Sequence, residues 1–314
     1  MMRRRFVMGF LVVVASVVLA VGCQSGQPGG AAEGKWLSWW EALSVEEKLS
    51  HIQPYMVEGA QLSADRPAPH LLSQQEVMIR AAEYVVQQGY LDPAHPIYEE
   101  VPELATAKVA EPVFVYNANF LAQGLIHGAY RIYAVDENDV DIAHVLIIGE
   151  QNIPEGEDSI LMRGLSVNET YPRHFITKEE AVAAFQEAFP GCVIEEPIAV
   201  RMWNMEGVMH SNVYISWYTD VSDAGAGRGA SSSATGYLMN AVMVVDPNAG
   251  VSSNPRAALS RSTVSGGWGT RIARIDEPLH LHEKLAAAKA RAAAGEPEPA
   301  VGPTEPVKIT PVEF

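Results

Sequence analysis

Two histidines separated by one residue, His280 and His282, are the clearest candidates for metal chemistry in this 314-residue sequence, and Glu283 follows them directly. Alternate residues of a β-strand point to the same face, so two imidazole rings at this spacing could converge on one ion. A third ligand is not identifiable, and the H-E-x-x-H pattern of zinc peptidases does not occur. We therefore predict no metal site and no cofactor, and interpret both histidines as surface or interface residues.

Two other residues, Ser265 and Cys192, could act as nucleophiles in a hydrolase. Ser265 lies in the segment STVSGGWGT, where glycines could present backbone N–H groups to an oxyanion. Cys192 follows a Pro-Gly pair without a flanking pattern of cysteine hydrolases, and we predict that it is a buried core residue. No G-x-S-x-G pattern occurs. We therefore predict that the chain is not an enzyme; the alternative is an envelope hydrolase that uses Ser265 or Cys192.

Aromatic hydroxyl groups alternate along the segment NVYISWYTD. In an extended strand Val213, Ile215 and Trp217 share one face, which suits a hydrophobic core. Tyr214 and Tyr218 share the opposite face. Tyrosine is enriched at protein interfaces, because its ring provides contact area at a low cost in conformational entropy. This face is therefore either a protein-binding surface formed by Tyr214 and Tyr218 or a second layer of the core.

The N-terminus has the layout of a secretory signal peptide, with Arg3, Arg4 and Arg5 before an apolar segment at 6–21. This segment is shorter than the roughly 20 residues that a membrane-spanning helix needs, although an uncleaved anchor is the alternative. The letters LAVGC, which end at Cys23, resemble the lipobox of bacterial lipoproteins.

The lipobox resemblance implies that residues 1–22 are removed and that Cys23 then carries acyl chains, palmitate among them. Such chains would hold the protein to a lipid bilayer in the cell envelope. Because Gln24 and not Asp follows the cysteine, the resemblance favours the outer membrane, facing the periplasm, in a Gram-negative cell. Residues 23–35 are small and nearly uncharged, which is typical of a flexible linker.

Acidic residues dominate the charge of the chain, which carries a net charge of −16. Such a chain is repelled by the phosphates of nucleic acid, so we exclude nucleic acid as a partner. Acidic pairs such as Glu99-Glu100 and Glu195-Glu196 are predicted to be solvated, because adjacent residues of a strand point to opposite faces. With Cys23 acylated, Cys192 has no second thiol for an intramolecular disulfide.

Two amphipathic helices are predicted from capping boxes and apolar stripes. The first begins with Ser73 and Glu76, and the second with Thr177 and Glu180. Their apolar stripes are Met78, Ala81, Ala82 and Val85 in the first helix, and Val182, Phe185 and Phe189 in the second. A similar box at Ser44 predicts a short helix next to three clustered tryptophans. Each apolar stripe must be covered by another layer of structure.

Three strand-like segments follow each helix. They lie at 112–120, 129–135 and 140–149 after the first helix, and at 197–203, 212–220 and 236–246 after the second. This order predicts an α+β fold with two tandem units, each an amphipathic helix packed on a small antiparallel sheet. The units are expected at 36–160 and 161–256, before a C-terminal extension at 257–314 with an Ala-rich helix and a disordered proline-rich tail.

The second unit resembles a PepSY-type domain between residues 175 and 251. The resemblance is carried by ITKEEAVAAF at the helix start, FPG at its end, and VVDPNAG after the last strand. Domains of this family are associated with binding or restraining peptidases, and they contribute no catalytic residues. The resemblance thus implies a membrane-anchored envelope lipoprotein that acts as a non-catalytic protein-binding or peptidase-restraining module, with an envelope protein or peptidase as its partner.

Overall fold

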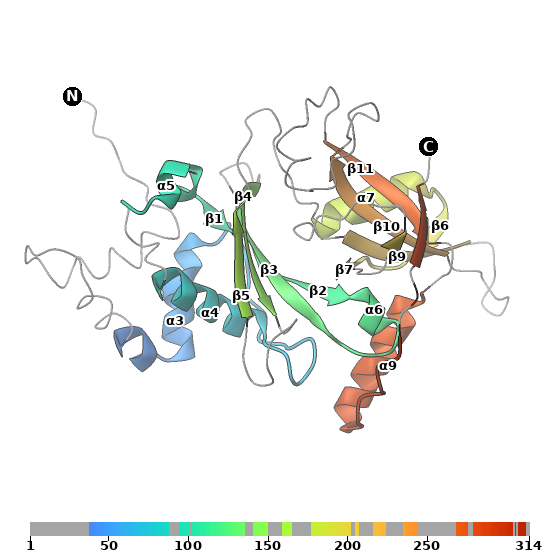
Figure 1. Cartoon of the computed structure of the whole chain (residues 1–314), viewed down its shortest axis with the longest axis horizontal. Coiled ribbons are helices and arrows are strands. Elements are labelled where there is room, and N and C mark those ends of the chain that lie inside the picture. The colour runs from blue at the N-terminus through green and yellow to red at the C-terminus, as the bar shows by residue number, and fades with distance from the viewer. Residues whose placement is uncertain are drawn as a thin grey trace, which may run out of the picture. The chain divides into compact units, whose positions relative to one another are not determined.

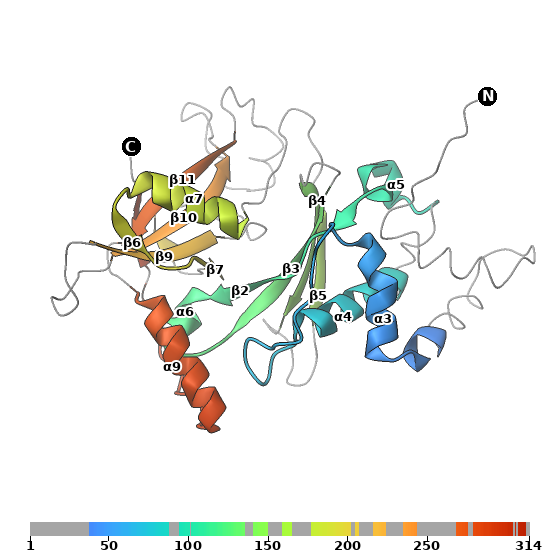
Figure 2. The same cartoon turned by 180° about the vertical axis from the view of Figure 1, so that it is seen from behind.

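The computed structural model (Figures 1 and 2) describes residues 38–87, 94–100, 102–135, 141–149, 159–164, 177–201, 205–206, 216–223, 235–243, 268–275, 279–303, 305 and 307–311. The chain forms two compact units. Unit 1 comprises Met1–Phe114 and Ala129–Arg173, and unit 2 comprises Val115–Gly128 and His174–Phe314. The predicted α+β class is confirmed. The units differ from the expected tandem arrangement, because residues 115–128 and the C-terminal segment belong to unit 2.

Unit 1 combines helices with an antiparallel sheet. Its elements are α3 (Val45–Ile52), the 3₁₀ helix η1 (Gln53–Tyr55), α4 (Gln74–Gln87), α5 (Ile97–Glu100), η2 (Pro102–Ala105), β1 (Lys108–Val109), β3 (Gly128–Val135), β4 (Asp141–Gly149) and β5 (Ser159–Gly164). Strand β4 pairs with both β3 and β5, and β1 pairs with β3. Strand β2 (Val113–Asn117) leads out of this unit into unit 2.

Helices α3 and α4 begin at the predicted capping boxes and lie side by side (Figures 1 and 2). At α4 the backbone N–H of Ser73 donates to Glu76 Oε2 at 2.7 Å, and the N–H of Glu76 donates to Ser73 Oγ at 3.3 Å. The predicted stripe is buried, since Met78 is fully enclosed and the other three members are at most 9% exposed. Trp40 is also fully buried, and its Nε1 donates to Glu83 Oε1 at 3.1 Å. Trp40 and the partly buried Trp39 therefore contribute to the core of unit 1.

Replacing Ser73 with alanine is expected to lower the free energy of unfolding by about 1 kcal/mol, because the N–H of Glu76 loses its acceptor. The exposed Ser50, inside α3, provides the matched control, and Ser50→Ala is expected to change stability by less than about 0.5 kcal/mol. Urea unfolding followed by circular dichroism measures both values. Equal losses in the two variants would contradict a capping role.

The pKa of Glu76 links this cap to pH. Burial by itself would raise the pKa, but hydrogen bonds from Ser73 and Arg66 hold it below its ordinary value of 4.5. Because the pKa of Glu76 is lower in the folded protein than in the unfolded chain, its ionised form stabilises the protein at pH values above the pKa of the unfolded chain. This contribution is lost as the pH falls through the pKa of the folded protein. The loss caused by Glu76→Gln should therefore be complete at neutral pH and shrink below a pH of about 4.5.

Unit 2 contains a mixed sheet. Its elements are α6 (Ala118–Leu121), α7 (Lys178–Ala188), β6 (Cys192–Ile194), β7 (Ile198–Arg201), β8 (Met205–Glu206), β9 (Ser216–Asp223), β10 (Thr235–Met243), β11 (Trp268–Ile275), α9 (Leu281–Ala294) and β12 (Val307–Pro311). The strand order is β2-β7-β9-β10-β11-β12-β8, and β6 also pairs with β9. The pairs β2–β7 and β12–β8 are parallel, so the predicted purely antiparallel sheet is wrong.

Local signals place both long helices of unit 2. Thr177 and Glu180 form the predicted capping box of α7, and Phe185 is fully buried, while Val182 and Phe189 are half-buried. The Ala-rich segment forms α9, which ends at Gly295 with a φ of 69°. Glycine adopts this left-handed conformation without the steric cost of a Cβ atom.

Three segments of unit 2 depart from the sequence predictions. The strand expected at 112–120 ends at Asn117. The Oδ1 of Asn117 accepts hydrogen bonds from the N–H groups of Asn119 and Phe120, so Asn117 caps the start of α6. Strand β11 forms at the end of the glycine-rich segment, which has no strand-like alternation. The proline-rich tail contains β12, which pairs with β11 and β8, so the prediction of a wholly disordered tail is wrong. Within the described residues, the helices are too short or too polar to cross a membrane.

Candidate functional site

A β-bulge in unit 2 brings together residues from three separate segments. Glu195 lies opposite Asp220, because its backbone N–H donates to the Asp220 carbonyl at 3.0 Å. The next pair of opposite residues is Ile198 with Tyr218. Two residues, Glu196 and Pro197, therefore lie between these pairs on one strand, whereas only one residue, Thr219, lies between them on β9. Bulges of this kind redirect side chains at the edge of a strand. Here the bulge turns the two glutamates in different directions.

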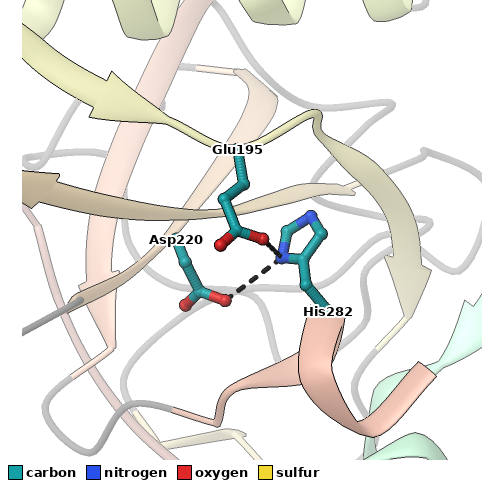
Figure 3. Close-up of side chains that lie close together, drawn as sticks. All are labelled: Glu195, Asp220 and His282. Atoms are coloured by element: carbon teal, nitrogen blue, oxygen red, sulfur yellow. Dashed lines mark hydrogen bonds and ion pairs between the residues drawn. The ribbon is translucent and has the colours of Figure 1, made fainter. Parts of the chain in front are cut away.

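Glu195, Asp220 and His282 form a cluster, shown in Figure 3. Nδ1 of His282 lies 3.1 Å from Asp220 Oδ2 and 3.2 Å from Glu195 Oε2. The three side-chain ligand atoms all lie within 4.8 Å of one another. The Asp220 side chain is 5% exposed and that of His282 is 17% exposed, whereas the Glu195 side chain is 49% exposed and opens the cluster to solvent.

The imidazole ring of His282 is held at both nitrogens. Nε2 lies 2.7 Å from the backbone oxygen of Glu196, and because a carbonyl can only accept, Nε2 carries the hydrogen and donates. The other ring nitrogen, Nδ1, faces the two carboxylates. His282 lies in the first turn of α9, and the preceding His280 has a left-handed backbone, with φ 48° and ψ 47°. The two histidines therefore do not share a strand face, because α9 begins between them.

Tyr218 orients the buried aspartate. Its hydroxyl donates to Asp220 Oδ1 at 2.6 Å, which leaves Oδ2 directed toward His282. The ring of Tyr218 also lies beside that of His282, with the ring centroids 6.0 Å apart. Burial and the neighbouring Asp220 carboxylate raise the pKa of Tyr218 well above its ordinary value. Tyr218 therefore remains a neutral donor and links the start of α9 to β9.

The other acidic residue of the loop has a separate partner. The Glu196 carboxylate forms an ion pair with Lys178 in the first turn of α7. The Glu195 carbonyl accepts a hydrogen bond from Thr219 Oγ1 at 2.6 Å. The two glutamates diverge as predicted, but Glu195 belongs to a cluster and its charge is not simply solvated. The loop is thus connected to α7, β9 and α9.

The structure relocates two of the predicted site residues. Cys192 is exposed at the start of β6, so the prediction that it is buried is wrong. Tyr218 is fully buried, and Ser216 and Trp217 are at most 4% exposed. Strand β9 is therefore covered on both faces, and Tyr218 belongs to the core layer. Its side chain therefore does not form an exposed binding surface. Cys23, Tyr214 and Ser265 lie outside the described residues, and their predicted roles stay predictions.

Sequence reasoning identified His282 as a possible ligand but missed Asp220 and Glu195 as its neighbours. The available signal was Asp220 close to the aromatic residues Trp217 and Tyr218, because a charged residue packed among them needs a partner. The partner could not be identified, because His282 lies 62 residues further along the chain. Only the tertiary fold, which brings the start of α9 to β9, places the two side chains together.

Comparisons with known proteins do not assign this cluster. No protein-family model, curated protein or solved structure matches the chain. The resemblances of residues 175–251 to a PepSY-type domain and of LAVGC to a lipobox therefore stay predictions.

Proposed function

We propose that this chain is a lipid-anchored protein of the cell envelope that binds another protein through unit 2 and does not catalyse a reaction. The observation that carries the proposal is the open edge of β6. Cys192 and Val193 are exposed there, and Val193, at 51%, is one of the three exposed large apolar side chains among the described residues. No strand within the described part of the chain pairs with the outer edge of β6.

The backbone of β6 supports strand addition by a partner. In an antiparallel pair, successive residues direct their hydrogen-bonding groups alternately toward the partner strand and away from it. Because the N–H of Glu195 bonds to β9, the backbone groups of Val193 also face β9, and those of Ile194 face outward. An extended segment of an envelope protein could bond to Ile194 and cover Val193. The PepSY-like resemblance makes a peptidase the expected partner.

The hydrogen bonds of His282 support a non-catalytic role. A general base needs a free ring nitrogen to accept a proton from a nucleophile. In this structure Nε2 donates to the Glu196 carbonyl, and Nδ1 lies against two carboxylates. The ring is thus directed toward acceptors and not toward a hydroxyl or thiol group.

Cys192 allows a direct test of the binding surface. With Cys23 acylated, it is the single free thiol of the chain, and a photoactivatable maleimide cross-linker can be attached to it in envelope membranes. We expect irradiation to link the protein to one envelope protein. Ile194→Pro removes the outward N–H and should reduce this adduct at least tenfold, because strand addition depends on that group.

A second cross-linker position provides the control. Moving the thiol to the exposed position 45 of unit 1, in the variant Cys192→Ser with Val45→Cys, should abolish the adduct. An identical adduct from both positions, or an adduct insensitive to Ile194→Pro, would overturn the β6 surface. A hydrolytic activity that disappears in Cys192→Ser would instead support the enzymatic alternative.

A further inference from the structure

We propose that unit 2 binds a divalent transition-metal ion between Glu195, Asp220 and His282. This inference is independent of the lipid anchor and of the β6 surface. Glu195 lies at the bulge, Asp220 lies opposite it on β9, and His282 lies in the first turn of α9. Each contributes one ligand atom, Oε2, Oδ2 and Nδ1 respectively. The ligands come from three segments of the chain, so an ion would connect β9, the β6–β7 loop and α9.

The separations of the ligand atoms fit a single ion. Two atoms bonded to one metal ion at about 2.1 Å lie about 3.0 Å apart at an octahedral right angle and about 3.4 Å apart at a tetrahedral angle. The distances from Nδ1 to the two carboxylate oxygens are 3.1 and 3.2 Å, which fall between these values. The two carboxylate oxygens lie within 4.8 Å of each other, so the three ligand atoms are close enough to share one ion after side-chain adjustment.

Hydrogen bonds outside the cluster orient its ligands as they do in metal sites. Metal-binding histidines commonly donate their second ring nitrogen to a backbone carbonyl, and ligating carboxylates are themselves hydrogen-bonded. Both arrangements are present, since His282 Nε2 donates to the Glu196 carbonyl and Tyr218 donates to Asp220 Oδ1. The lone pair of Nδ1 and the free oxygen Oδ2 of Asp220 are thereby directed to the same point.

The charge of the cluster favours a cation. Two carboxylates face one imidazole, and in the described part of the chain His282 is the ion-pair partner of both. The nearby Lys178 pairs with Glu196 instead. Even a protonated imidazole would leave the cluster with a net negative charge, shared between the buried Asp220 and the half-exposed Glu195. A divalent ion would neutralise both carboxylates.

The donor set indicates the class of ion. One imidazole and two carboxylates suit Zn²⁺, Mn²⁺ or Fe²⁺, whereas Cu⁺ prefers sulfur ligands and Mg²⁺ and Ca²⁺ prefer oxygen alone. Three protein ligands leave at least one position for water, and the half-exposed Glu195 places that position on the solvent side. We use Zn²⁺ and Mn²⁺ as probes.

The test is a titration of the purified, detergent-solubilised full chain after treatment with a chelator. Isothermal titration calorimetry is expected to detect one equivalent of Zn²⁺ or Mn²⁺. Asp220→Asn and Glu195→Gln should each weaken binding at least tenfold, since each removes a negatively charged ligand. Glu195 is half-exposed, so its variant is expected to fold normally even if Asp220→Asn does not.

Matched variants separate ligation from general structural damage. Tyr218→Phe should weaken binding about 10- to 100-fold through the lost support of Asp220, which is a positioning effect. His280→Asn beside the helix start should leave binding unchanged, because asparagine tolerates the left-handed backbone at 280. Bound Co²⁺, followed by its visible absorption, should report loss of the nitrogen ligand in His282→Ala.

Two results would overturn the metal site. One is a wild-type protein that binds neither probe ion with a Kd below about 1 mM, which would make the cluster a simple imidazolium–carboxylate ion pair. The other is binding that Glu195→Gln and His282→Ala do not weaken, which would place the ion among the other histidines of the chain. Partner capture at β6 is measured in a separate experiment, so failure of either proposal is distinguishable from failure of the other.

Discussion

Replacing Phe185 with alanine is expected to lower the free energy of unfolding by about 3–5 kcal/mol. The ring of Phe185 is fully buried on α7, which lies beside β6 in unit 2 (Figure 1). Its removal would leave a cavity as well as a loss of buried apolar surface. Urea unfolding monitored by circular dichroism measures the change, and it should appear in the transition that belongs to unit 2.

The same helix contains the matched control. Phe189 ends α7 and is half-buried, so Phe189→Ala should cost clearly less than Phe185→Ala. Cys192→Ala should cost less than about 0.5 kcal/mol, because the thiol is exposed. A large loss from Cys192→Ala, or equal losses from the two phenylalanine variants, would contradict the packing of α7 described above.

Replacing Cys23 with serine is expected to abolish membrane retention of the protein. We expect radiolabelled palmitate to enter the wild-type protein and not Cys23→Ser, because serine has no thiol to receive a diacylglycerol. Two or more acyl chains bury many methylene groups at about 0.8 kcal/mol each, so their loss should move the protein fully into the soluble fraction.

Cys192→Ser is the control for this experiment, since it removes the other thiol of the chain and should leave labelling and retention unchanged. An unlabelled wild-type protein that stays in the membrane fraction would support the uncleaved apolar anchor instead. Labelling that persists in Cys23→Ser would show that the lipobox resemblance is misleading.

The starts of the helices could be predicted because their signals are local. Ser44, Ser73 and Thr177 each lie three residues before a glutamate, and each pair satisfies backbone N–H groups within a single turn. The buried stripe of α4 follows from helical periodicity in the same way. These contacts join residues close in sequence, so they can be recognised without knowledge of the rest of the fold.

Strand pairing was less predictable, because it joins distant segments. Strand β11 has no regular alternation of apolar and polar residues, and β12, although it alternates, lies in a proline-rich tail that is typical of disorder. Their partners supply the hydrogen bonds, and the parallel pairing of β2 with β7 requires a crossover between remote residues. The open edge of β6 likewise depends on the whole fold, because in the described part of the chain no strand pairs with its outer side.

The sequence by itself determined the α+β class, the capped helices and the candidacy of His282. The tertiary structure decided the rest of the candidate site, because Glu195, Asp220 and His282 meet only when the bulge between β6 and β7 turns Glu195 toward the first turn of α9. The same packing encloses Tyr218, which decides for the core-layer alternative, and leaves Cys192 exposed, contrary to its prediction as a buried core residue. Residue type and spacing describe one segment at a time, whereas burial and ligand geometry depend on several segments at once.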